Sequence, residues 1–257
     1  MNAGYFIAIV LVSGFVAGTI HGAVNLAIVE PYLDEAISIE NRNLFTSGEA
    51  EDTPQFWVEY NSYRDWQKSG QLLAGGILGM SIGALFGIVF AYSRNSLPKG
   101  HTVKKTFVLA AIMWFTIFLI PFLKYPANPP TVGDADTVVL RGILYIAFIT
   151  ISGFSAVGFS ILYKKLENKK YFAFVGYAVF ITAVFFIMPP SPIIEWCYAV
   201  SPLCHITDEV TAPMDLVNGF RTMSVMAVTT FWVAEAIILG ALWQKYKTKL
   251  DESSFET

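Results

Sequence analysis

Long apolar runs alternate with short polar stretches along the chain, and this pattern predicts membrane-spanning helices. Six runs each hold about 18 or more residues with almost no charge, enough to cross a hydrocarbon core of ~30 Å. They are residues 4–29, 71–92, 106–123, 142–163, 171–188 and 222–243. Backbone groups find no partners in lipid, and the runs do not alternate as barrel strands do. We therefore predict an all-α integral membrane protein, a bundle of about six transmembrane helices forming one domain over residues 1–257.

Composition agrees with a membrane protein. Of the 257 residues, 54% are hydrophobic and only 14% are charged, and the mean hydropathy is +0.53. A soluble domain has roughly 25% charged residues. The first apolar run is too long for the core of a signal peptide and no convincing cleavage site follows it. We therefore expect it to remain as a helix.

Positive charge falls on alternate connections. Residues 93–105 hold four Lys or Arg and no acid, and residues 164–170 hold four Lys against one Glu. The C-terminal tail adds Lys245, Lys247 and Lys249. In a chain of six spans these three segments share one side, which the positive-inside rule makes cytoplasmic. Both termini are therefore predicted to be cytoplasmic.

The outer loops, residues 30–70, 124–141 and 189–221, are acidic or mixed. Residues 30–70 contain nine Asp or Glu against three Lys or Arg. These acids are either left over when basic residues stay inside, or they form an electronegative vestibule that concentrates cations. The two halves of the 30–70 loop predict amphipathic helices along the interface. Aromatic anchors there would be Phe56, Trp57, Tyr60, Tyr63 and Trp66.

Glycines recur at every fourth position of two predicted spans. They are Gly14, Gly18 and Gly22 in the first span and Gly75, Gly79, Gly83 and Gly87 in the second. Small residues let membrane helices approach closely, so these two spans are predicted to pair. The interface could be a static contact or a surface along which the helices slide.

Polar residues inside spans suggest function because they cost free energy there. His21 and Asn25 lie one turn apart in the first span, and Glu30 follows at its outer end. Imidazole with carboxylate suits divalent metals such as cobalt, nickel or zinc. The alternative is a histidine that hydrogen-bonds a neighbouring helix. Glu235, in the last span, could relay protons, bind a passing metal ion or make a structural hydrogen bond.

Two arginines and two cysteines lie at or beyond the outer ends of spans. Arg141 and Arg221 are predicted to open the fourth and sixth helices, where each could reach the interface or pair with acids of the outer loops. Cys197 and Cys204 could form a disulfide outside the cytoplasm. The sequence holds no phosphate-binding loop, dinucleotide motif or catalytic triad. We therefore expect no enzyme activity. Because the chain has no visible means of hydrolysing ATP, any transport must draw its energy from a gradient or another subunit.

Three stretches carry a resemblance to a known family. They are GFVAGTIHGAVNLAIVEPYLDEA, PFLKYPANPPTVGDADTVVLR and TDEVTAPMDLVNGFRTMSVMAVTTFW. Together with the glycine-rich second span, they make the chain similar to the CbtA family of predicted cobalt-transporter subunits. The resemblance implies a multi-pass membrane protein with a role in cobalt uptake linked to cobalamin synthesis. It also implies a small one-helix partner that carries histidines, and cobalt as a transported ion rather than a bound cofactor.

Two functional hypotheses follow. In the first, a divalent metal ion passes from the acidic outer loops along Asn128, Glu30, Asn25 and His21 toward Glu235. In the second, the protein is an accessory subunit that transports nothing and packs within a larger membrane complex. Few ionisable groups lie inside the spans, which favours the second hypothesis.

Overall fold

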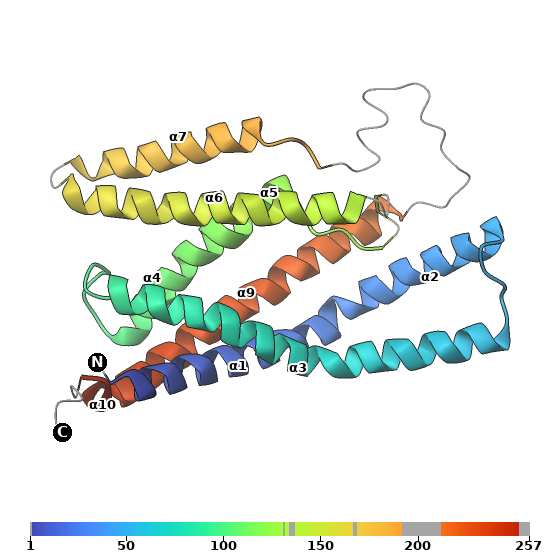
Figure 1. The fold of residues 1–257 in the computed structure, drawn as a ribbon, viewed down its shortest axis with the longest axis horizontal. Helices are drawn as coiled ribbons and strands as arrows, with labels where there is room; N and C mark the ends of the chain where they lie inside the picture. Colours follow the sequence, from blue (N-terminus) through green and yellow to red (C-terminus); the bar gives the residue numbers. More distant parts are fainter. Residues whose placement is uncertain (1, 131, 134–136, 167–168, 192–211, 252–257) are drawn as a thin grey trace. The chain divides into compact units, whose positions relative to one another are not determined.

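The computed structural model describes residues 2–130, 132–133, 137–166, 169–191 and 212–251, and all the regular structure within these ranges is helical (Figure 1). The helices are α1 (Ala3–Ile28), α2 (Glu30–Ser47), α3 (Pro54–Ser93), α4 (Thr102–Met113), a π-helical stretch (Trp114–Leu119), α5 (Ile120–Lys124), α6 (Val138–Lys165), α7 (Tyr171–Ile187), α9 (Met214–Lys245) and α10 (Lys247–Asp251). The predicted all-α fold is confirmed. Cys197 and Cys204 lie outside the described residues.

Five helices in the described part of the chain are long and apolar enough to cross a membrane. They are Ala3–Ile28, Pro54–Ser93, Thr102–Lys124, Val138–Lys165 and Met214–Lys245. The sixth predicted span corresponds to α7, which has 17 residues. At 1.5 Å per residue α7 is ~25 Å long, somewhat shorter than a typical hydrocarbon core. The protein is therefore an integral membrane protein, and its described part contains five full-length candidate spans and one shorter apolar helix.

The second span is much longer than the sequence pattern predicted. Helix α2 ends at Ser47 and is capped by Gly48, whose φ of 76° is the left-handed conformation that glycine adopts without strain. Helix α3 then begins at Pro54, with the Thr53 side chain accepting a hydrogen bond from the Phe56 amide. It continues unbroken to Ser93, so residues 54–70 are not a separate helix. At 40 residues α3 is ~60 Å long, about twice the thickness of a hydrocarbon core.

Two other helices begin earlier than expected. Helix α9 starts at Met214 and α6 at Val138. Arg221 therefore lies in the third turn of α9 and Arg141 at the fourth position of α6, so neither opens its helix. The first turn of α9 contains Asp215, whose negative charge is favourable at a helix N-terminus. The predicted starts were late because each uncharged run begins just after an arginine, whereas the helix continues through that residue toward its N-terminus.

The helices group into two compact units, residues 1–112 with 214–257, and residues 113–213. In the first unit α1 packs against both α3 and α9. Gly14 and Gly18 of α1 pack directly on Gly75 and Gly79 of α3, so a Cβ on any of the four would overlap the backbone of the facing helix. Further along the same interface Gly83 lies against Gly14, while the space beside Gly87 is filled by a valine side chain of α1. The glycine rows thus bring two backbones into contact.

In the second unit a proline explains a local change of helix type. Within the π-helical stretch each amide pairs five residues back, as Ile120 N–H does with the Phe115 carbonyl. Pro121 has no N–H, so it cannot donate to the Thr116 carbonyl in this register. The buried Ser152 of α6 donates its hydroxyl to that carbonyl at 2.5 Å and also lies 3.0 Å from the Tyr177 hydroxyl. A side chain of another helix therefore compensates for the missing amide.

Replacing Ser152 with Ala should destabilise this unit. The Thr116 carbonyl would lose the hydroxyl that replaces the Pro121 amide, and hydrogen bonds between membrane helices contribute about 0.6 kcal/mol on average and up to about 1.7 kcal/mol. We expect a lower midpoint of thermal unfolding in detergent. Ser155→Ala is the matched control, since the Ser155 hydroxyl bonds within its own helix. Equal midpoints for the two variants would contradict the assigned role of Ser152.

Candidate functional site

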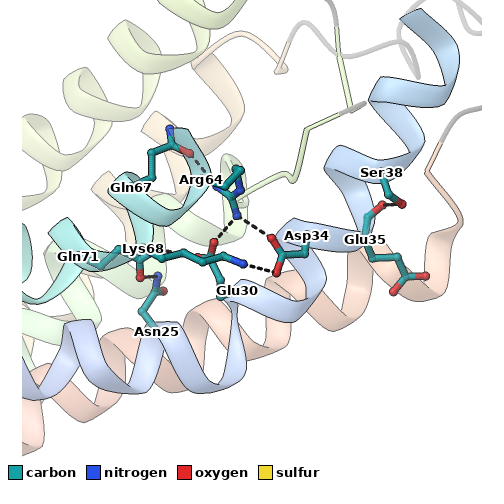
Figure 2. Close-up of polar contacts among 9 residues, drawn as sticks. All are labelled: Asn25, Glu30, Asp34, Glu35, Ser38, Arg64, Gln67, Lys68 and Gln71. Carbon is teal, nitrogen blue, oxygen red and sulfur yellow. Dashed lines mark hydrogen bonds and ion pairs between the residues drawn. The ribbon is translucent and has the colours of Figure 1, made fainter. Parts of the chain in front are cut away.

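A buried charge cluster joins α2 to α3 just beyond the end of α1 (Figure 2). Arg64 of α3 donates from Nη2 to Glu30, in a short contact, and to Asp34 at 2.8 Å. Lys68 donates to the other oxygen of Asp34 at 2.7 Å. Glu30 is 3% exposed and Arg64 7% exposed, so this pair is almost dry. We call these four residues the charge clamp, and its formal charges cancel.

Two amides extend the charge clamp toward the membrane-spanning part of α1. Gln71 of α3 donates from Nε2 to Glu30 at 2.5 Å, and its Oε1 accepts from Asn25 of α1 at 3.3 Å. Figure 2 shows the Asn25 amide bonded to Gln71, close to Glu30. The Gln71 amide occupies the second carboxylate oxygen of Glu30, so that carboxylate is bonded on both sides. As it stands, Glu30 is a structural anion rather than an open metal ligand.

The electrostatics of Asp34 show the effect of its neighbours. Burial alone would raise the pKa of its carboxyl, but the hydrogen bonds from Lys68 and Arg64 outweigh it and hold the pKa below its ordinary value. Asp34 therefore contributes stability at pH values above the ordinary carboxyl range, and this contribution is lost as acid protonates it. The charge clamp should be intact at neutral pH.

His21 lies one turn of α1 inward from Asn25, on the side that meets α9. Its Nδ1 is 2.8 Å from the carbonyl oxygen of Ala227. Because a carbonyl only accepts, Nδ1 carries the proton and the lone pair is on Nε2. Metal-binding histidines usually have this arrangement, with one nitrogen anchored to a carbonyl and the other available to the metal. The contact with α9 is also the helix–helix bond that the alternative interpretation of His21 expected.

Glu235 lies deeper along the same α1–α9 interface. It is fully buried, and its Oε1 is 3.1 Å from the hydroxyl of Ser13, which is also fully buried. Ser13 precedes His21 by eight residues, and Glu235 follows Ala227 by eight, so the two contacts are about 12 Å apart along the helices. The other carboxylate oxygen, Oε2, has no hydrogen-bond partner in the structure.

The structure gathers some of the sequence-derived candidates and separates others. His21, Asn25, Glu30 and Glu235 all lie in the first unit, along or just beyond α1. Asn128 belongs to the second unit, as does Arg141, whose Nη1 donates to the Val132 carbonyl at 3.0 Å. In the described parts of the chain, no three His, Cys, Asp or Glu side chains gather as a metal site would require.

Most of the charge clamp was not predicted from the sequence, although a signal was present. Glu30 and Asp34 are four residues apart in α2, and Arg64, Lys68 and Gln71 are four and three apart in α3. Each set therefore occupies one helix face. Two complementary faces on either side of a predicted turn indicate pairing. Ser13 was also missed, because a serine among glycines and alanines looks like one more small packing residue.

The comparison with known families fits a membrane protein of this kind. Residues 4–244 match the family model described as "Probable cobalt transporter subunit (CbtA)". The chain belongs to the CbtA family. The CbtA family is described as that of a probable cobalt transporter subunit, which agrees with the membrane-spanning helices of this chain. No curated protein and no solved structure matched the chain.

Proposed function

We propose that this CbtA protein is the membrane component of an uptake system for a divalent metal ion, cobalt, that supplies cobalamin synthesis. Support comes from the family match and from the membrane-spanning helices. The basic connections favour cytoplasmic N- and C-termini, as the positive-inside rule requires. In this orientation the charge clamp is on the outer side and Glu235 nearer the inner side.

The observation that carries the proposal is the orientation of His21. Its Nδ1–H is bound to the Ala227 carbonyl, so the Nε2 lone pair can accept a borderline metal such as cobalt. His21 is half-buried on a largely apolar helix, and a polar side chain there costs free energy, which suggests a function. Asn25, one turn outward, offers an amide oxygen because its nitrogen is the atom that bonds Gln71.

A route past His21 needs more ligands than α1 supplies. Glu30 is bonded to Arg64 and Gln71, and the described residues hold no cluster of three metal-binding side chains. We propose that the remaining donors are water, backbone carbonyls and a small one-helix partner subunit that carries histidines. Asn128, in the other unit, is proposed as an oxygen donor at the outer mouth.

The same bonding pattern favours one second candidate, a subunit that packs in a larger membrane complex without moving an ion. All the carboxylates of the charge clamp are paired, as expected of a structural element. Purification from native membranes in mild detergent separates the two functions. Stoichiometric association with an unrelated enzyme would favour the accessory role, and association with a histidine-bearing one-helix subunit would favour transport.

Replacing His21 with Ala tests the transport proposal in cells. We expect cobalt accumulation to fall several-fold, because the ion would lose the imidazole nitrogen that α1 offers. The matched control is His101→Ala, which removes an exposed histidine from the connection between α3 and α4. Both variants should reach the membrane at the level of the unaltered protein. Unchanged accumulation in the His21 variant would exclude this route.

A further inference from the structure

If the Glu235 carboxyl is ionised, the single hydroxyl hydrogen of Ser13 faces two acceptor oxygens. Ser13 Oγ lies 3.0 Å from the Val10 carbonyl and 3.1 Å from Glu235 Oε1. A carbonyl and a carboxylate oxygen are both acceptors, and a serine hydroxyl has a single hydrogen to donate. A proton on Glu235 resolves this, because the carboxyl then donates to Ser13 Oγ while Ser13 donates to Val10.

Among the residues that the structure describes, no basic side chain pairs with Glu235. The neighbouring positions are Ser13 and Gly14 of α1, Gly83 of α3, and Thr106 of α4, which donates to the adjacent Ala236 carbonyl at 2.6 Å. None of these four groups titrates or carries a charge. The ion pairs found among the described residues all belong to the charge clamp. An ionised carboxylate in such a place would be very costly.

The packing also argues against a metal ion. A Cβ added to Gly83 would lie 3.4 Å from Glu235 Oε1, which is ordinary contact, so α3 closes over this side of the carboxyl. One carboxylate and one hydroxyl are too few ligands for a first-row divalent ion, which takes four or more. The other oxygen, Oε2, is buried and has no hydrogen-bond partner. An ionised or metal-bound carboxylate oxygen would need a partner there.

We propose that Glu235 and Ser13 form a proton-binding site inside the membrane-embedded part of the protein. The proton sits on the carboxyl, is donated to Ser13 Oγ, and holds α9 against α1. Loss of the proton would place an uncompensated charge against the glycine backbones of α1 and α3. Proton release and separation of α9 from α1 are therefore thermodynamically linked. The site does not depend on the identity of any transported ion.

Infrared spectroscopy of the purified full-length protein in lipid tests the proposal directly. We expect a carbonyl stretching band of a protonated carboxylic acid at neutral pH, and its loss in Glu235→Gln, which keeps the size of the side chain. Ser13→Ala should keep the band and shift it, since the acid loses its hydrogen-bond acceptor. Glu30 provides an internal comparison, because it is buried but paired with Arg64 and should give no such band. Identical spectra for the unaltered protein and the Glu235 variant would overturn the proposal.

Thermal stability gives a second readout. As the pH rises from about 4 to neutral, the unfolded chain loses the Glu235 proton that the folded protein keeps. The unaltered protein should therefore lose stability over this range, whereas Glu235→Gln should lose less. The difference between the two melting midpoints should therefore change with pH. A difference that stays constant across this range would show a purely structural role for the carboxyl and contradict the proposal.

Discussion

Arg64→Ala should strongly destabilise the protein. The substitution leaves Glu30, which is 3% exposed, as a buried carboxylate with only Gln71 to bond it. Breaking one partner of a buried ion pair typically costs about 3–5 kcal/mol, because the remaining charge stays desolvated. We expect a large fall in the thermal midpoint in detergent and reduced accumulation in membranes.

Lys68→Ala is the matched control for this change. Lys68 pairs with Asp34, and the two side chains are 34% and 43% exposed. Exposed pairs contribute about 0–1 kcal/mol, so the effect should be small. Replacing both Glu30 and Arg64 with Gln removes the two charges together and should recover much of the lost stability. If the Arg64 and Lys68 variants melt alike, the charge clamp does not hold α2 to α3.

Gly79→Ala should disrupt the contact between α1 and α3. The added Cβ would overlap the Gly14 carbonyl oxygen, which belongs to backbone and cannot rotate away. The helices must separate locally, and overpacking of this kind costs about 1–3 kcal/mol. Since Gly14 directly follows Ser13 in α1, and Ser13 bonds Glu235 of α9, the variant should also weaken that hydrogen bond. A thermal melt measures the first effect and the infrared band of Glu235 the second.

Gly70→Ala provides the comparison within the same helix. Gly70 has nothing within 4 Å of where its Cβ would be, so the extra methyl group is accommodated. Alanine also favours a helix by about 1 kcal/mol over glycine. We therefore expect Gly70→Ala to melt at or above the midpoint of the unaltered protein. A Gly79 variant as stable as the Gly70 variant would mean that the two helices are not in fixed contact.

Apolar runs and glycine spacing were sufficient to predict which segments are helical and which two spans meet. Both can be read from a single helix, because the length of an apolar run shows whether it can span the membrane and the glycine spacing shows that the glycines share one helix face. The continuation of α3 to Pro54 was not predicted because residues 54–70 were expected to form a separate amphipathic helix along the interface. The apolar run ends where these polar residues begin, and hydropathy does not show that the helix continues. The π-helical stretch was missed because Pro121 shows only that a backbone hydrogen bond is lost. It does not show which helix type or which side chain compensates for that loss.

The candidate site was predicted in part, and the residue that was not predicted, Arg64, changes the chemistry of Glu30. His21, Asn25 and Glu30 were visible as polar residues on or after an apolar helix. Arg64 lies 34 residues from Glu30, and only the turn between α2 and α3 brings them together. Its guanidinium turns Glu30 from a possible metal ligand into half of an ion pair. Similarly, the missing hydrogen at Glu235 is evident only once the positions of both Ser13 and Val10 are known.

Cobalt uptake into lipid vesicles tests the central claim most directly. The protein would be purified from native membranes with the subunits that accompany it and reconstituted, and trace cobalt inside the vesicles would be measured over time. We predict uptake well above that of empty vesicles, a several-fold loss with His21→Ala and no loss with His101→Ala. Uptake equal to that of empty vesicles, or equal in the two histidine variants, would contradict a metal route past His21.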